Sequence, residues 1–220
     1  MECISVRSLF KSYDGINAVD GIDLDVVKGQ IFGFLGPNGA GKSTVIKLLT
    51  TLIHPTSGKI SVLKIDALKE PLKIRKKIGV VLQQPSYEPT LSVEKSLEKY
   101  GMMWNLDKKT RNDRTEELLI TFNLVEIRKK KNEDLSIGQR RRVQVAREFM
   151  HDMDLLFLDE PTVGLDPTAR RQLLDFLKNK EKETNQTIFY TTHYLTKGKS
   201  LCNKFQKITK RKNVTIKYTK

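Results

Sequence analysis

The chain has 220 residues, 38% hydrophobic and 30% charged, and its 40 Lys and Arg against 26 Asp and Glu give a formal net charge of +14. This composition is typical of a globular domain with a sizeable core, and the charge favours contact with a polyanion such as nucleic acid or an anionic membrane. Because the longest apolar runs fall far short of the ~18 residues of a transmembrane helix, we expect a chain that does not span a membrane by itself. The start lacks a basic region followed by an apolar one, so we do not expect export.

The first 35 residues favour short antiparallel strands. Apolar and polar positions alternate here, for example over Ile22–Val26, and Asp14-Gly15 and Lys28-Gly29 are turn signals. The run Ile31–Leu35 is apolar throughout, which is typical of a strand buried on both faces. A glycine-rich turn follows it, and then the helical pattern Thr44–Leu52.

Three more apolar runs predict buried strands, and these are Ile78–Leu82, Leu155–Leu158 and Thr187–Thr191. Strands buried on both faces and separated by helices indicate a mostly parallel sheet. Residues 86–150 carry no strand pattern, and we expect about three helices there, including Val93–Trp104 and Arg114–Phe122.

We therefore predict one α/β domain over residues 1–220, with a mostly parallel sheet, an N-terminal antiparallel β subdomain and an inserted helical lobe. The core lobe is expected at about 1–85 and 153–220, and the helical lobe at about 86–152. Near the end of the chain, the alternating segment Val214–Tyr218 predicts a strand after a turn near Arg211–Asn213.

The segment Gly36–Thr44 has the pattern G-x-x-x-x-G-K-[ST] between a strand and a helix, which is the context of a phosphate-binding loop, or P-loop. Glycines let the backbone wrap closely around phosphates, and successive N–H groups at a helix N-terminus attract anions. Lys42 is expected to add a charge at the β- and γ-phosphates, and the Ser43 hydroxyl is a magnesium ligand. The phosphate-binding residues that we predict are Gly36, Asn38, Gly39, Ala40, Gly41, Lys42, Ser43 and Thr44.

Two acids, Asp159 and Glu160, end the apolar strand at Leu155–Leu158. In a parallel sheet this end lies at the same edge as the P-loop. Asp159 is then expected to hold Mg²⁺, directly or through water, and Glu160 to activate the attacking water as a general base.

Several further motifs resemble those of the ABC ATPases. Leu135–Gln139 resembles their signature sequence, Val163–Asp166 their D-loop, and His193 their switch histidine. Gln83, or its neighbour Gln84, stands where the family has its Q-loop glutamine, and strand register favours Gln83. Tyr13 stands where the family has an aromatic residue that stacks on adenine. The alternative is that Tyr13 is an ordinary surface tyrosine packed against its neighbours.

The resemblance implies a P-loop NTPase core and an ATPase that binds ATP and Mg²⁺. Two such domains meet head to tail around two ATP molecules, as a homodimer or with a second ATP-binding subunit. Ser136, Gly138, Gln139 and Asp166 then contact nucleotide across the interface, while Glu160, His193 and Gln83 serve catalysis and Ser43, Gln83 and Asp159 hold the metal. A separate membrane subunit is expected as partner, so the chain would be cytoplasmic, at the inner face of the membrane. The sequence of Asp159–Pro167 is similar to the corresponding segment of drug-export-type subunits.

The sequence departs from the family at two places. Ile137 replaces the usual glycine of the signature, so the start of the following helix must have ordinary backbone angles. After His193 the chain is basic, with nine Lys or Arg and no acid over residues 197–220, and contact with anionic lipid is one interpretation. Solvated surface is the other, for this segment and for the cluster Arg128–Lys131.

Two other functions stay open. The net charge suits a soluble ABC ATPase that acts on nucleic acid or ribosomes, although residues 86–150 are too few for the coiled coils of such proteins. A regulatory domain that binds ATP without turnover is the second alternative. The two cysteines, Cys3 and Cys202, have no metal-ligand spacing, and we expect both as reduced thiols.

Overall fold

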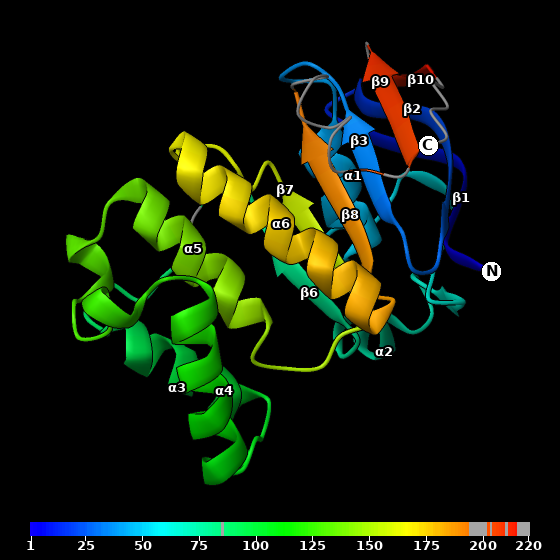
Figure 1. Ribbon diagram of the computed structural model, residues 1–220. Helices are drawn as coiled ribbons and strands as arrows, with labels where there is room; N and C mark the ends of the chain where they lie inside the picture. Colours follow the sequence, from blue (N-terminus) through cyan, green and yellow to red (C-terminus); the bar gives the residue numbers. More distant parts are fainter. Residues whose placement is uncertain (85, 194–201, 203, 210, 215–220) are drawn as a thin grey trace. The chain divides into compact units, whose positions relative to one another are not determined.

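The computed structural model describes residues 1–84, 86–193, 202, 204–209 and 211–214 (Figure 1). By their contacts, the residues form two units. Unit 1 comprises Met1–Gln83, Met153–Glu160 and Phe176–Lys220, and unit 2 comprises Gln84–Asp152 and Pro161–Asp175. Residues 161–175, which the sequence analysis assigned to the core lobe, cluster with the helices of unit 2.

A six-stranded sheet forms the centre of unit 1, in the order β10-β9-β3-β8-β7-β6. Five of its strands run parallel, and β10 is antiparallel to β9. Every residue of β3, β7 and β8 is buried, as their apolar sequences predict. The mostly parallel sheet is therefore confirmed, and its strands are β3 (Ile31–Leu35), β6 (Ile78–Val81), β7 (Leu155–Asp159), β8 (Thr187–Thr192), β9 (Lys204–Thr209) and β10 (Lys212–Val214).

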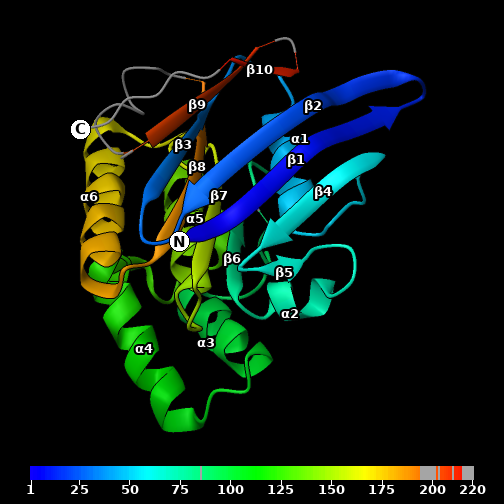
Figure 2. The ribbon, with the colours of Figure 1, turned by 90° about the vertical axis from the view of Figure 1, so that its right-hand side faces the viewer.

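The second sheet of unit 1 is antiparallel, with the order β2-β1-β4-β5 (Figure 2). Its first two strands, β1 (Glu2–Tyr13) and β2 (Ile16–Val27), have twelve residues each and are longer than the short strands expected. Asp14 and Gly15 connect them and both have positive φ, which matches the twist of a tight hairpin. The sequence analysis missed β4 (Ser57–Val62) and β5 (Ile65–Asp66).

Helix α1 (Lys42–Leu49) contacts β2 of one sheet and β7 of the other. Apolar residues of both sheets and of α1 belong to one buried cluster, which includes Leu24, Phe34, Val45 and Phe157. Helix α1, which follows the P-loop, is therefore packed against both sheets. The remaining short helix of unit 1 is α2 (Pro71–Arg75).

The C-terminal segment contributes two strands, of which β9 was not expected. A strand was expected at Val214–Tyr218 after a turn near Arg211–Asn213; β10 already begins at Lys212, and residues 215–220 lie outside the described part. No sequence pattern marks β9, because its two apolar residues, Phe205 and Ile208, are three positions apart and do not alternate with polar ones, although both are buried. Part of the basic segment is thus an interior strand of the sheet.

Unit 2 is helical, as expected, and within its described residues the only β pairing is the bridge between Ser92 and Lys131. Ser92 and Asp107 accept hydrogen bonds from backbone N–H groups at the starts of α3 and α4, which are typical helix caps. Its helices are α3 (Val93–Met103), α4 (Lys108–Thr121), the 3₁₀ turns at Val125–Ile127 and Asn132–Asp134, α5 (Ile137–Glu148) and the first part of α6 (Pro167–Thr184).

The basic cluster Arg128–Lys131 lies on unit 2, and acids pair with most of it. Arg128 contacts Glu94 at 2.6 Å and Glu116 at 2.5 Å, and Lys129 also contacts Glu94. This pairing favours the interpretation of the cluster as ordinary surface. Within the described residues, no helix is both long and apolar enough to cross a membrane.

The contact between β9 and β3 gives a prediction. A Cβ at Gly33 would lie 2.4 Å from Phe205 Cδ1 and 2.8 Å from Cys202 Sγ, so Gly33→Ala should overpack this site and lower the free energy of unfolding by about 1–3 kcal/mol. Urea unfolding measures the effect. Gly138→Ala is the control, because a Cβ there has no contact closer than 3.4 Å. Equal stability of the two variants would show that β9 does not pack on β3.

Candidate active site

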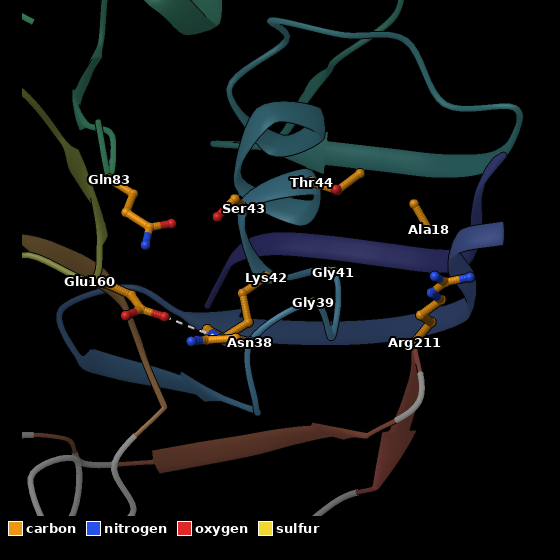
Figure 3. Close-up of a pocket in the computed structure, with 10 residues that line it drawn as sticks. All are labelled: Ala18, Asn38, Gly39, Gly41, Lys42, Ser43, Thr44, Gln83, Glu160 and Arg211. Carbon is orange, nitrogen blue, oxygen red and sulfur yellow. Dashed lines mark ion pairs between the residues drawn. The ribbon is translucent and has the colours of Figure 1, made fainter. Parts of the chain in front are cut away.

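A pocket of about 400 Å³ lies at the start of α1, and all its lining residues belong to unit 1. Figure 3 shows Gln83 and Glu160 at one end of it, and Ala18 and Arg211 at the other. Most of the predicted phosphate-binding residues line this pocket, together with one predicted catalytic residue from each of two neighbouring strand ends. The lining residues are Ala18, Asn38, Gly39, Gly41, Lys42, Ser43, Thr44, Gln83, Glu160 and Arg211.

The P-loop has the backbone that its glycines allow. Gly39 and Gly41 have φ of 76° and 97°, which residues with a Cβ rarely adopt. A Cβ on Gly41 would lie 2.5 Å from the carbonyl oxygen of Ala18, and one on Gly36 would lie 2.6 Å from Ile208. Gly36 and Ala40 do not line the pocket. Gly36 instead donates its N–H to the carbonyl of Thr192, and Ala40 is buried.

Lys42 is buried, and its ammonium group has three oxygen partners. It donates to the carbonyls of Gly36 at 2.8 Å and Pro37 at 3.1 Å, and it lies 3.1 Å from Glu160 Oε1. Both members of this ion pair are only 5% exposed. Burying a charge without a partner costs much free energy, so Lys42 and Glu160 are held in contact with each other beside the pocket.

Glu160 follows β7 in a tight turn with φ of 48°. Its second carboxylate oxygen lies 2.7 Å from Nδ1 of His193, which follows β8. The predicted catalytic residues Glu160 and His193 are therefore in direct contact. Gln83, two residues after β6, lines the same pocket, whereas Gln84 does not.

Thr191 on β8 connects the two acids, and the sequence analysis gave it no role. Its hydroxyl donates to Asp159 Oδ1 at 2.6 Å and accepts from the N–H of Glu160 at 3.0 Å. The signal that could have found it is the pair of threonines directly before His193, because hydroxyls at the end of a buried strand need partners.

Asp159, the last residue of β7, is buried. It does not line the pocket, whereas Ser43 and Gln83 do. The oxygen atoms of Ser43 and Gln83 suit Mg²⁺, which prefers hard oxygen ligands and keeps several waters. These two residues fit the metal directly, and a water could link Asp159 to it.

Tyr13 lies outside the pocket lining, at the end of β1. Its ring is about half exposed, and Lys11 Nζ lies 4.9 Å from the ring centroid. Its contact with adenine stays a prediction.

The signature residues belong to unit 2 and begin α5. Ser136 caps this helix, since its hydroxyl accepts the Gln139 N–H at 3.2 Å and its own N–H donates to Gln139 Oε1 at 2.9 Å. Ile137 is the first residue of the helix and does not have positive φ, so the backbone here accepts a β-branched residue. A Cβ at Gly164 would lie 2.7 Å from Ile137 Cγ2, so Ile137 depends on the glycine of the D-loop.

Asp166, the predicted D-loop contact to nucleotide, caps α6. Its Oδ1 accepts the N–H groups of Thr168 at 2.9 Å and Ala169 at 3.0 Å. The hydrogen bond from Ala169 contributes most to holding the pKa of Asp166 below its ordinary value. Asp166 is thus ionised near neutral pH and shapes the start of the helix.

A P-loop after β3 and an acid pair at the end of β7, at one edge of a parallel sheet, define the class of P-loop nucleoside triphosphatases. The chain belongs to the ABC transporter family, whose model matches residues 19–163. This confirms the resemblance inferred from the signature, D-loop and switch motifs.

Two curated relatives are resistance proteins. Linearmycin resistance ATP-binding protein LnrL of Bacillus subtilis is 38% identical over 201 residues, which cover 91% of this chain and 64% of that protein. Daunorubicin/doxorubicin resistance ATP-binding protein DrrA of Streptomyces peucetius is also 38% identical, over 91% of this chain and 61% of its own length. The chain thus spans less than two thirds of the length of these relatives.

Among solved structures, a dimeric structure of MJ0796, a bacterial ABC transporter cassette, has a TM-score of 0.89 and 26% identity, and the match covers 96% of each chain. The predicted P-loop NTPase core is therefore confirmed.

The double role of Thr191 gives a prediction. Thr191→Val keeps the shape but leaves a buried Asp159 oxygen and the Glu160 N–H without this partner, so we expect a loss of about 1–3 kcal/mol in the free energy of unfolding. Denaturant unfolding at neutral pH measures it. Thr191→Ser retains the hydroxyl and should lose much less. Equal losses would mean that the methyl group, rather than the hydrogen bonds, matters at this position.

Proposed function

We propose that this chain is the ATP-hydrolysing subunit of an ABC transporter. The observation that supports it is the meeting of Lys42, Ser43, Gln83 and Glu160 in one pocket, with His193 bound to Glu160. A pocket that combines a phosphate loop, oxygen ligands for magnesium and a positioned carboxylate suits phosphoryl transfer to water.

In this proposal the P-loop N–H groups and Lys42 bind the β- and γ-phosphates of ATP. Magnesium, held by Ser43 and Gln83 with Asp159 behind them, would neutralise phosphate charge when bound. The phosphate oxygens compete with Glu160 for Lys42, which frees Glu160 Oε1 to accept a proton from the attacking water. His193 holds the other oxygen of the same carboxylate and so fixes its direction.

The site is expected to be completed by a second ATP-binding domain. Ser136 and Ile137 are exposed at the start of α5, where a helix N-terminus favours a phosphate group. Val163 of the D-loop is also exposed. Exposed apolar side chains such as Ile137 and Val163, together with the N-terminus of α5, suit an interface that forms around ATP. The partner would be a second copy of this chain or a paired ATP-binding subunit.

A separate membrane subunit is the proposed partner, at the inner face of the cell membrane, and the names of the curated relatives favour a drug-export-type transporter. The pairing of Arg128 and Lys129 with acids weakens the case for the alternative function on nucleic acid, because these charges are already neutralised.

Steady-state hydrolysis of MgATP over a range of protein concentrations tests the proposal. We expect activity to rise more than linearly with concentration, and Glu160→Gln to lower turnover by about 10²-fold or more, because it removes the general base. The variant should still bind ATP. Glu183→Gln, an exposed glutamate on α6 that does not line the pocket, is the control. Wild-type turnover by Glu160→Gln would refute the role of Glu160.

The basic end of the chain is proposed to contact anionic lipid. Deleting residues 204–220 would be a poor test, because β9 is part of the sheet. Replacing both Lys217 and Lys220 with Gln instead should weaken binding to phosphatidylglycerol vesicles by about 30-fold, at ~1 kcal/mol for each charge near the surface. Sedimentation with the vesicles measures binding, and Lys129→Gln with Lys130→Gln is the matched control. Equal binding by both double variants would refute the proposal.

A further inference from the structure

Arg211 lies at the pocket although no motif points to it. It belongs to the turn between β9 and β10, about 170 residues after the P-loop in sequence. In Figure 3 its guanidinium group points toward Ala18, at the end of the pocket away from Gln83 and Glu160. Among the described residues, no carboxylate forms an ion pair with Arg211 in the structure.

The turn holds Arg211 in an unfavourable backbone conformation. Its φ is 68°, in the left-handed region that costs a residue with a Cβ about 1 kcal/mol or more. Glycine would take this conformation without that cost. The side chain is therefore kept at a position where the backbone alone would favour glycine.

Contacts on both sides fix the turn against the pocket. The carbonyl of Arg211 accepts the N–H of Asp20 at 3.0 Å, and Lys212 forms an ion pair with Asp20 at 3.2 Å. Ile208 of β9 packs so closely against Gly36 of the P-loop that a Cβ on Gly36 would lie 2.6 Å from Ile208 Cγ2. Arg211 is thus positioned by the same strand that supports the phosphate loop.

The orientation of a nucleotide follows from the proposed function, on which this inference rests. With the γ-phosphate near Glu160 and Gln83, the phosphate chain passes the P-loop, and the ribose and base extend toward Ala18 and Arg211 (Figure 3). We propose that the guanidinium group of Arg211 binds the ribose and base of the nucleotide. A planar guanidinium is suited to this task, because it stacks on flat rings and donates hydrogen bonds in its plane.

The test compares Mg·ADP with Mg·pyrophosphate, which shares the two phosphates and lacks the nucleoside. Isothermal titration calorimetry gives both dissociation constants. We expect Arg211→Gly to weaken ADP binding about tenfold, the effect of one contact of the cation–π or hydrogen-bond kind. Binding of pyrophosphate should stay unchanged. Glycine relieves the positive φ, so the variant should fold at least as stably as the wild type, which thermal unfolding checks.

Lys64→Gly is the matched control. Lys64 is also a cation in a hairpin turn of unit 1, with φ of 64°, and it lies outside this pocket. Its replacement should leave both affinities unchanged. Equal ADP binding by wild type and Arg211→Gly would overturn the inference, and so would an equal loss for pyrophosphate, which would place the guanidinium on the phosphates. A wild-type protein that binds neither ligand would instead refute the proposed ATP site.

Discussion

The parallel pairing of β9, β3, β8, β7 and β6 is the constraint on which the site depends. Parallel strands end at the same edge of a sheet, so whatever follows each strand is brought to one place. The P-loop follows β3, Glu160 follows β7, His193 follows β8, and Gln83 comes just after β6. No long-range side-chain contact is needed to assemble these groups, because the backbone ladder already fixes their order along the edge.

At that edge, the ion pair between Lys42 and Glu160 has a further role in the proposed mechanism. Both groups are nearly inaccessible to water, so each needs the other as long as no phosphate is present. An arriving phosphate offers Lys42 a stronger anion and leaves the carboxylate to its second partner, His193. In the proposed mechanism, Glu160 therefore neutralises the buried Lys42 when no nucleotide is present and is available as a base once phosphate is bound.

The sequence predicted the parallel sheet and most of the site because both depend on local patterns. Apolar runs marked β3 and β7, the segment Thr187–Thr191 marked β8, and the spacing of glycines around Lys42 marked the loop. It failed where long-range pairing decides the structure. The mixed, basic pattern of β9 carries no clear strand signal, and only its pairing with β3 shows that Phe205 and Ile208 belong to the core. Arg211 was not predicted as a site residue for the same reason.

The position of β9 also has a consequence for synthesis on the ribosome. The loop that would receive ATP is complete in sequence by residue 44, yet Ile208, which packs beneath Gly36, emerges more than 160 residues later. Until then one edge of β3 lacks its neighbour, and an unpaired edge is open to association with other strands. A nascent chain thus carries the phosphate-binding motif long before β9 can pack beneath it.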